Sequence, residues 1–452
     1  MHFHFIAIGG SAMHNLAIAL HLKGEKVTGS DDEIFEPSKG RLAKYGLLPS
    51  KIGWDARQIH QKIDAVILGM HAREDNVELK KAQSLNIPIF SYPEFIYEQT
   101  KDQLRVVIGG SHGKTSITSM ILHVLSKNNI DHNYMVGAQL DGFECMVKLS
   151  KTSKIAVLEG DEYLSSPIDR RPKFHLYHPN IAVISGIAWD HINVFPTFEN
   201  YVEQFKIFIE KVENSGVVVY YNGDKELTQL INKVDSPIAK IPYEAYPHYI
   251  EDGITYLKTN EGHKPIKIFG EHNLQNLNAA YNVCLELGVT SSDFFDAIAT
   301  FKGASKRLEL VKMYETTAVY KDFAHSPSKL KATTAALKKQ YPNRKLVACM
   351  ELHTFSSLNK SFLSHYQNTM KEADCAFVYY NMHTLKHKKL DDLSKEEVKA
   401  AFGSNNVKVV TSSNDLVQQL TEMNWENQNL LMMSSGNFGG LDFTELAAQI
   451  RN

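Results

Sequence analysis

The sequence predicts an α/β fold divided into three domains. Short apolar runs alternate along the chain with longer segments of helical periodicity, the pattern of parallel strands joined by helices. Two of these runs, at residues 3–8 and 106–108, lead directly into glycine-rich turns, and the 452 residues suffice for several domains with separate cores. The expected parts, all α/β, are a Rossmann-like N-terminal domain, a central P-loop domain and a Rossmann-like C-terminal domain, at residues 1–98, 104–307 and 308–452.

Composition and charge exclude some classes of function. Hydrophobic residues make up 43% of the chain and charged residues 22%, which is ordinary for a globular protein. The formal net charge of -2 argues against a nucleic-acid-binding protein. The four cysteines show no C-x-x-C spacing, so we expect reduced thiols and a cytoplasmic location. We expect no secretory leader, and no membrane insertion because no apolar stretch approaches about 18 residues.

The N-terminal domain opens with a pattern typical of Rossmann units. Residues 3–8 read as a strand, residues 12–22 as a helix and residues 26–29 as a second strand. In such units phosphates lie on the helix N-terminus, and an acidic side chain about 20 residues later faces the ribose. The residues in those positions are Gly9, Gly10, Ser11 and Asp31. Ala7 and Asn15 stand where the dinucleotide-binding motif has glycines, so the motif is incomplete. A dinucleotide site and a purely structural turn are both interpretations of this segment.

The rest of this domain follows the same alternation. Residues 65–69 read as a strand and residues 76–85 as a helix, and the polar stretch 98–103 is expected to be a linker.

The central domain begins with residues 106–116, which read VVIGGSHGKTS. A strand, a glycine-rich loop and a helix N-terminus in this order hold nucleotide phosphates. Lys114, expected to lie exposed on the loop, would supply charge to the β- and γ-phosphates, and Thr115 or Ser116 would ligate Mg²⁺. Ile108 replaces the first glycine of the full motif. The candidate ATP-binding residues here are Gly110, Ser111, His112, Gly113, Lys114, Thr115 and Ser116.

Two further side chains follow buried-type strands of the central domain. Glu159 comes after the run 155–158, and His191 lies shortly after the run 181–184. Ligands of open parallel sheets bind beyond the carboxyl ends of the strands, and a carboxylate with one imidazole suits Mg²⁺ or Mn²⁺. From position alone, a capping carboxylate and a buried structural histidine are equally good interpretations.

The C-terminal domain is again expected to alternate strands and helices. Strands are predicted at residues 317–320, 346–350, 375–379 and 430–433, and a helix begins near residue 328. A glycine-rich loop, SSGNFGG at residues 434–440, follows the last strand.

Taken in order, these motifs resemble those of the Mur ligases, the ATP-dependent amide-bond enzymes of peptidoglycan synthesis. The short G-S-H-G-K-T loop, the strand followed by E-x-D-E, the Asp-His pair and the H-N-x-x-N run at residues 272–276 carry the resemblance. It implies that the N-terminal turn binds the UDP of a UDP-sugar, UDP-N-acetylmuramate. It also implies that ATP and Mg²⁺ act in the central domain, where Lys114, Glu159 and His191 are the catalytic residues and Thr115, Glu159 and His191 hold the metal.

The resemblance assigns further residues. It implies that ATP also contacts His272, Asn273, Asn276, Arg307 and Asp322, and that His325, Ser434 and Gly436 face the amine substrate. Lys206 matches the position of a carbamylated lysine in several family members, although the run 203–210 also reads as an amphipathic helix with an exposed lysine.

Within the family, two local features resemble members that use a preformed murein peptide, and this resemblance implies such a peptide over free L-alanine as the amine substrate. The two features are Tyr163, which closes the segment EGDEY, and the loop 434–440, while residues 351–355 depart from the arginine-bearing segment usual in the family. A Rossmann dehydrogenase and a non-catalytic nucleotide-binding protein are the alternatives from other classes. The first leaves Lys114 unexplained, and the second leaves the complete catalytic set unexplained.

Overall fold

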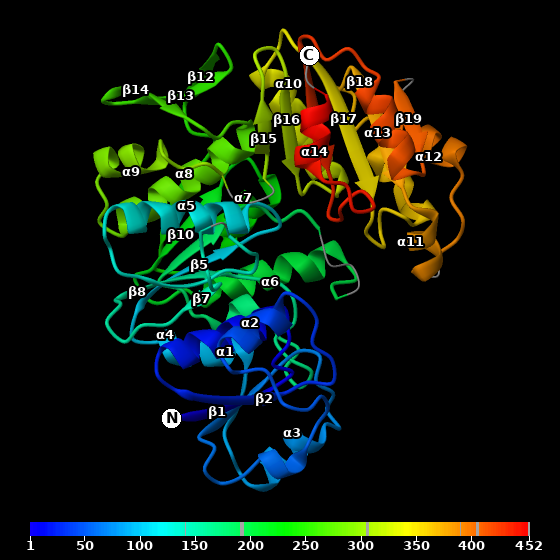
Figure 1. The fold of residues 1–452 in the computed structure, drawn as a ribbon. Helices are drawn as coiled ribbons and strands as arrows, with labels where there is room; N and C mark the ends of the chain where they lie inside the picture. The colour runs from blue at the N-terminus through cyan, green and yellow to red at the C-terminus, as the bar shows by residue number, and fades with distance from the viewer. Residues whose placement is uncertain (141, 190–193, 304–306, 389, 404–405, 451–452) are drawn as a thin grey trace. The chain divides into compact units, whose positions relative to one another are not determined.

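The computed structural model describes residues 1–452 except 141, 190–193, 304–306, 389, 404–405 and 451–452. The chain divides into two compact units (Figure 1). The first comprises residues 1–244 and 275–298, and the second comprises residues 245–274 and 299–452.

The N-terminal part of the first unit is a parallel sheet of order β2-β1-β3-β4. Alternate residues of β1 and β3 face opposite sides: Phe3 and Phe5 pack with helix α1, whereas Val66 and Leu68 pack with α3. Its elements are β1 (His2–Ile6), α1 (Ser11–Leu22), β2 (Lys26–Ser30), α2 (Ser38–Lys44), the 3₁₀ helix η1 (Ala56–Gln58), β3 (Ala65–Leu68), α3 (Val77–Ser84), β4 (Ile89–Ser91) and α4 (Tyr92–Thr100).

The expected linker at residues 98–103 is wrong in its first half. Helix α4 begins after Ser91, where Ser91 and Glu94 form a capping box and Pro93 lies in the first turn, and it runs to Thr100.

The rest of the first unit is a sheet of order β11-β10-β9-β5-β8-β6-β7, parallel except for the short pair β6–β7. The chain leaves β5 for β6 on one side and later places β9 on the other side, so β5 lies at the switch point of the topology. Its elements are β5 (Leu104–Gly109), α5 (Lys114–Lys127), β6 (Asn133–Met135), β7 (Val147–Lys148), β8 (Ile155–Glu159), the 3₁₀ helix η2 (Lys173–Leu176), β9 (Ile181–Ile184), α6 (Phe198–Glu210), β10 (Val217–Tyr221), α7 (Lys225–Lys233), β11 (Ala239–Tyr243), α8 (Glu271–Glu286, which begins in the second unit) and α9 (Ser291–Ile298).

The second unit contains a small antiparallel sheet, β12-β13-β14, and a sheet of order β15-β16-β20-β17-β18-β19 that is parallel except for β15. Val347 and Cys349 of β17 pack with helices α13 and α14, whereas Leu346 and Ala348 pack with α10, so helices cover both faces. The elements are β12 (His248–Glu251), β13 (Ile254–Thr259), β14 (Gly262–Ile266), β15 (Glu309–Met313), β16 (Ala318–Asp322), α10 (Pro327–Gln340), β17 (Lys345–Leu352), the 3₁₀ helix η3 (Lys360–Tyr366), β18 (Cys375–Tyr380), α11 (Met382–His387), α12 (Lys395–Phe402), β19 (Val407–Val410), α13 (Ser413–Thr421), β20 (Gln428–Met433) and α14 (Phe443–Gln449).

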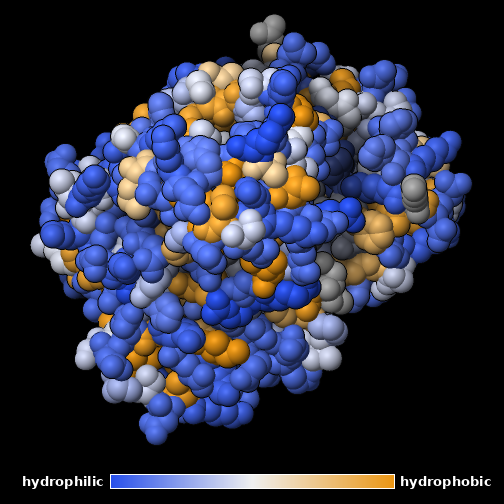
Figure 2. All heavy atoms as spheres, turned by 90° about the horizontal axis from the view of Figure 1, so that it is seen from below, coloured by the Kyte–Doolittle hydropathy of each residue, from blue (hydrophilic) through white to orange (hydrophobic). Residues whose placement is uncertain are grey.

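The face of the molecule drawn in Figure 2 is mostly hydrophilic, with hydrophobic residues in separate patches. None of the helices in the described part of the chain has the length and apolar character needed to cross a bilayer.

Candidate active site

The glycine-rich loop lies between the carboxyl end of β5 and the start of α5. Gly110 and Gly113 adopt φ values of +118° and +82°, a region that other residues rarely occupy. A Cβ on Gly113 would lie 2.2 Å from Oδ1 of Asn276, so the loop has no room for a side chain there. Gly113 also caps α5 without a side-chain acceptor for the helix amides. This helix N-terminus has the geometry and the charge preference of an anion site.

Lys114 is held by two oxygen atoms of the first unit. Its Nζ donates to Gly110 O at 2.8 Å and to Oε2 of Glu162 at 2.7 Å. The lysine side chain is 18% exposed and that of Glu162 only 1%, so the expectation of an exposed loop lysine is wrong. Burial opposes the lysine charge, but the carboxylates of Glu162 and Asp161 outweigh burial and raise the pKa of Lys114. The lysine is therefore a fixed cation at the mouth of the loop.

Glu162 is a site residue that was not predicted from the sequence. Besides pairing with Lys114, it accepts a hydrogen bond at 3.2 Å from the amide of Gly110 through Oε1. The signal was present in the E-x-D-E segment after β8, whose last glutamate is Glu162. The neighbouring Asp161 pairs with Lys173 at 2.6 Å. Burial favours its neutral form, but Lys173 and Lys114 prevail and lower the pKa of Asp161.

Glu159 and Thr115 bring two oxygen ligands together. The Thr115 hydroxyl donates to Oε1 of Glu159 at 2.9 Å, and the amide of Gly137 donates to Oε2 at 3.1 Å. Burial raises the pKa of Glu159 against the effect of these bonds. A hydroxyl and a carboxylate are the donors that Mg²⁺ prefers, so these residues fit the expected metal. In the described residues no three His, Cys, Asp or Glu side chains converge, and His191, the expected third ligand, lies outside those residues.

The remaining loop residues are tied to their surroundings. The hydroxyl of Ser111 donates to Ala188 O at 2.6 Å, and that of Ser185 donates to the carbonyl of His112. Ser116 is buried in the first turn of α5. Lys206 lies on α6 with a 44% exposed side chain, 3.1 Å from Glu203 and 3.9 Å from Glu210. Its observed contacts are those of a surface lysine on a helix.

The N-terminal turn is organised by Asp31. Its Oδ2 accepts a hydrogen bond from the amide of Gly9 at 2.7 Å, and burial raises its pKa. Ala7 takes φ +69°, the conformation for which a glycine would be expected. Gly10 caps α1 without a side-chain bond, and Ser11 begins the helix at the surface. The turn therefore presents the N-terminus of α1. The Asp31 carboxylate, which was expected to face a ribose, also holds the loop through its bond with the Gly9 amide.

In the second unit, Asp322 fixes the chain just before β15. Its Oδ2 accepts from the amide of Leu308 at 2.7 Å and its Oδ1 from Ala324 at 2.6 Å. Burial raises the pKa of Asp322 despite these bonds. The adjacent Arg307 lies over the ring of Phe323, 5.1 Å from its centroid.

The other expected ATP and amine residues of this unit lie at the start of α8, which holds His272 and Asn273, and after β16, where His325 lies. Asn273 donates to Phe269 O at 2.9 Å, and burial and then the charge of Arg307 lower the pKa of His272 to about 4. The carbonyl of His325 accepts from the Tyr366 hydroxyl at 2.6 Å.

The loop of Ser434 and Gly436 is attached to β17 by Glu351. This buried carboxylate accepts hydrogen bonds from the Ser434 hydroxyl and, at 2.9 Å, from the amide of Phe438. Gly436 donates to the Ser434 hydroxyl at 2.6 Å, and a Cβ there would lie 2.8 Å from both Glu351 and His353. These two loop amides are thus used within the protein. Glu351 is a second residue whose site role the sequence argument missed.

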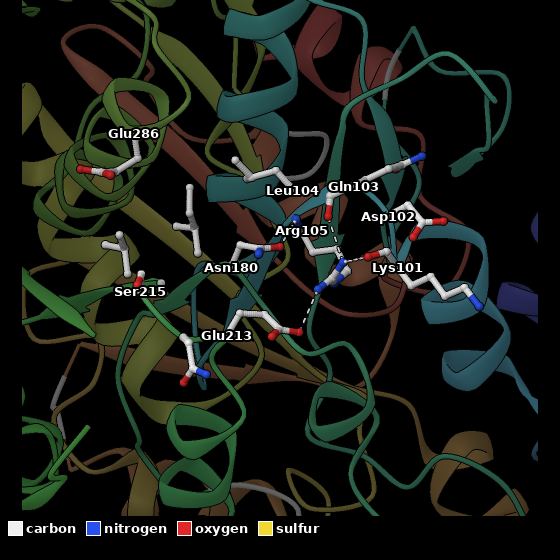
Figure 3. Close-up of a pocket in the computed structure, with 13 residues that line it drawn as sticks. Lys101, Asp102, Gln103, Leu104, Arg105, Asn180, Glu213, Ser215 and Glu286 are labelled. Carbon is white, nitrogen blue, oxygen red and sulfur yellow. Dashed lines mark hydrogen bonds and ion pairs between the residues drawn. The ribbon is translucent and has the colours of Figure 1, made fainter. Parts of the chain in front are cut away.

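A cavity of 630 Å³ lies at the other edge of the central sheet, beside the first residues of β5, β9 and β10 (Figure 3). The P-loop lies at the carboxyl edge, so this cavity is separate from it. At its centre the guanidinium of Arg105 donates to the carbonyls of Thr100, Lys101, Gln103, Tyr177 and His178 and to Glu213. Arg105 thus joins the end of α4 to the central sheet, a structural role.

Comparison with known proteins supports the domain pattern. Three family profiles match in succession: "Mur ligase family, catalytic domain" at residues 2–103, "Mur ligase middle domain" at residues 108–284, and "Mur ligase, glutamate ligase domain" at residues 306–436. The UDP-N-acetylmuramate–L-alanine ligase of Caldicellulosiruptor bescii is 33% identical over 392 residues, which cover 83% of each chain.

Two crystal structures share the fold over the whole chain. The UDP-N-acetylmuramate–alanine ligase of Thermotoga maritima gives a TM-score of 0.69 at 20% identity, covering 100% of this chain and 98% of that one. The murein peptide ligase of Psychrobacter arcticus gives 0.63 at 21% identity, covering 100% and 99%. The predicted three-domain α/β fold is confirmed.

Proposed function

Because the chain belongs to the Mur ligase family of ATP-dependent ligases that form C–N bonds, we propose that it joins UDP-N-acetylmuramate to a preformed murein peptide, L-alanyl-γ-D-glutamyl-meso-diaminopimelate. The observation that carries the ligase chemistry is the arrangement around Lys114. A partly buried cation, a helix N-terminus without a side-chain cap and the Thr115–Glu159 pair surround one loop.

In the proposed reaction the lactyl carboxylate attacks the γ-phosphorus of ATP. An O–P bond forms, the bond to the ADP oxygen breaks, and an acyl phosphate results. The peptide amine then attacks the acyl carbon, loses a proton and expels inorganic phosphate as the amide forms.

The residues of the first unit assist phosphoryl transfer by charge and position. Lys114 would place its charge beside the phosphates, and the α5 amides would bind their oxygens where negative charge develops. Glu162 holds Lys114 and the Gly110 amide in place before the nucleotide arrives. Thr115, Glu159 and His191 would hold Mg²⁺, which neutralises phosphate charge when bound.

The choice of amine rests on the segment around Tyr163 and on the loop 434–440. A peptide with several carboxylates gains remote binding energy that can orient its amine. L-Alanine is the second candidate, and the name of the Caldicellulosiruptor bescii relative favours it.

A phosphate-release assay with UDP-N-acetylmuramate and each amine tests this assignment. We expect kcat/KM for the tripeptide to exceed that for L-alanine by about 100-fold, equivalent to about 3 kcal/mol of contact energy. Comparable values, or a preference for alanine, would assign the chain to the alanine ligases. No phosphate release with either amine would reject both candidates.

Glu351→Gln is expected to raise KM for the amine about tenfold and to leave KM for ATP unchanged. Both bonds that hold the loop 434–440 go to Oε2 of Glu351, and the neutral carbonyl oxygen of glutamine accepts them more weakly than a carboxylate does. Steady-state kinetics with each substrate varied would measure this. Glu372→Gln is the matched control, because Glu372 forms an exposed surface pair with Lys371. An equal effect of both substitutions on KM for the amine would show that Glu351 has no specific role in amine binding.

Glu159→Gln is expected to raise the Mg²⁺ concentration for half-maximal rate at least about tenfold. The neutral amide is a poorer ligand for a hard cation. Binding of the UDP-sugar, measured by calorimetry, is expected to stay unchanged because the Asp31 turn is separate from this pair. An unchanged metal requirement would make Glu159 a structural residue.

A further inference from the structure

A second cavity of the first unit has a strongly basic lining. It measures 550 Å³, within the range of small-molecule sites. It lies between the segment around η2 and the helix α6, and no aspartate or glutamate lines it. The lining residues are Arg170, Arg171, Pro172, His175, His178, Gln204, Ile207 and Lys211.

Two of the cations at this cavity, both on exposed residues, have no carboxylate partner in the described part of the chain. Among the described residues, neither Arg170 nor Lys211 has a carboxylate within ion-pair distance, whereas Arg171 pairs with Asp169 at 2.6 Å and with Glu94 at 3.4 Å. The dipole of α6 accounts for a lysine at its C-terminal cap. It does not account for Arg170, which reaches the same cavity from another segment.

Two histidines in the lining have lowered pKa values, first because they are buried and then because cations lie near them. His175 is 5% exposed, and its Nε2 lies 2.8 Å from Gln204 O. Burial, and then the charges of Lys211 and Arg171, lower its pKa to about 4 despite that hydrogen bond. His178 faces Lys211, Arg105 and Arg171 as well as Glu213, and its pKa is also lowered, first by burial. A bound anion would favour the charged form of both rings and so raise their pKa values.

We propose that this cavity binds a small phosphate dianion, with Arg170 and Lys211 supplying the charge and the histidines lining its wall. The charge of two unpaired cations matches a dianion, and the volume admits inorganic phosphate or a small phosphate ester. The site shares no residue with the P-loop. It lies next to Lys173, the partner of Asp161 beside Lys114, so an occupant would contact the segment that leads back to the nucleotide loop.

Histidine-ring NMR of the full chain tests the site. A non-hydrolysable ATP analogue fills the P-loop first, and His175→Gln and His178→Gln variants assign the two rings. Inorganic phosphate is expected to shift both ring signals in a saturable manner at neutral pH. A parallel titration with glycerol phosphate distinguishes the sources, because tighter binding of either probe identifies which form of phosphate the cavity prefers.

Charge-matched variants decide whether the binding is specific. Arg170→Gln/Lys211→Gln is expected to weaken phosphate binding about tenfold or more. Lys225→Gln/Lys233→Gln, which removes the same charge from exposed positions of α7, is expected to have no effect. Equal affinities in the two double variants, or rings that do not respond to either probe, would overturn the proposal.

Discussion

Lys114→Met is expected to reduce the rate of phosphate release at least about 1000-fold. The methionine retains the length and apolar stem of lysine but removes the charge that stabilises the transferring phosphoryl group. Single-turnover measurements with UDP-N-acetylmuramate, ATP and the amine would separate this loss from weaker nucleotide binding. Retention of wild-type turnover would remove the glycine-rich loop from the chemistry.

The same substitution is also expected to destabilise the first unit, because it leaves the carboxylate of Glu162 buried without its partner. Breaking a buried pair from one side costs about 3 kcal/mol or more. Lys114→Met/Glu162→Gln removes both charges and is expected to recover most of the stability but none of the activity. Urea unfolding and kinetics of both variants therefore distinguish a catalytic lysine from one that only supports the fold.

Local patterns predicted most of the fold. The run 181–184 became β9 and the segment 12–22 became α1 with one added residue, because an apolar run or a helical period is a property of neighbouring residues. The end of α4 was missed although its capping box and proline were visible in the sequence. The polar composition of residues 98–103 led to the prediction of a linker instead, since a polar surface helix and a linker have similar compositions.

Local patterns predicted the site only where its residues are close in sequence, whereas the pairing of Thr115 with Glu159 was expected from the family resemblance. The loop from Gly110 to Ser116 could be predicted because its glycines and its lysine are neighbours in the sequence. The roles of Glu162 and Glu351 depend on partners 48 and 83 residues away, and such pairings arise only when the sheets assemble. Asp322 likewise accepts bonds from the backbone of Leu308 and Ala324. These bonds could not be inferred from a family motif that assigns this aspartate to ATP binding.

Arg105→Met is expected to lower the free energy of unfolding by about 3 kcal/mol or more. The Arg105 side chain is 4% exposed. Its guanidinium donates to carbonyls at and after the end of α4 and to those of Tyr177 and His178. It also donates to the Glu213 carboxylate (Figure 3). Without it these acceptors lose their donor, and those of Thr100 and Tyr177 belong to buried residues. Urea denaturation followed by circular dichroism would measure the change.

Two controls show whether the fork of Arg105 or only its charge is required. Lys101→Met removes a neighbouring exposed cation paired with Glu98 and is expected to cost less than about 1 kcal/mol. Arg105→Lys keeps the charge, but a single ammonium group cannot reach acceptors on both sides of the joint, so it is expected to recover only part of the loss. Full recovery by lysine would show that charge alone suffices. Wild-type stability of Arg105→Met would show that the joint between α4 and the central sheet does not depend on this residue.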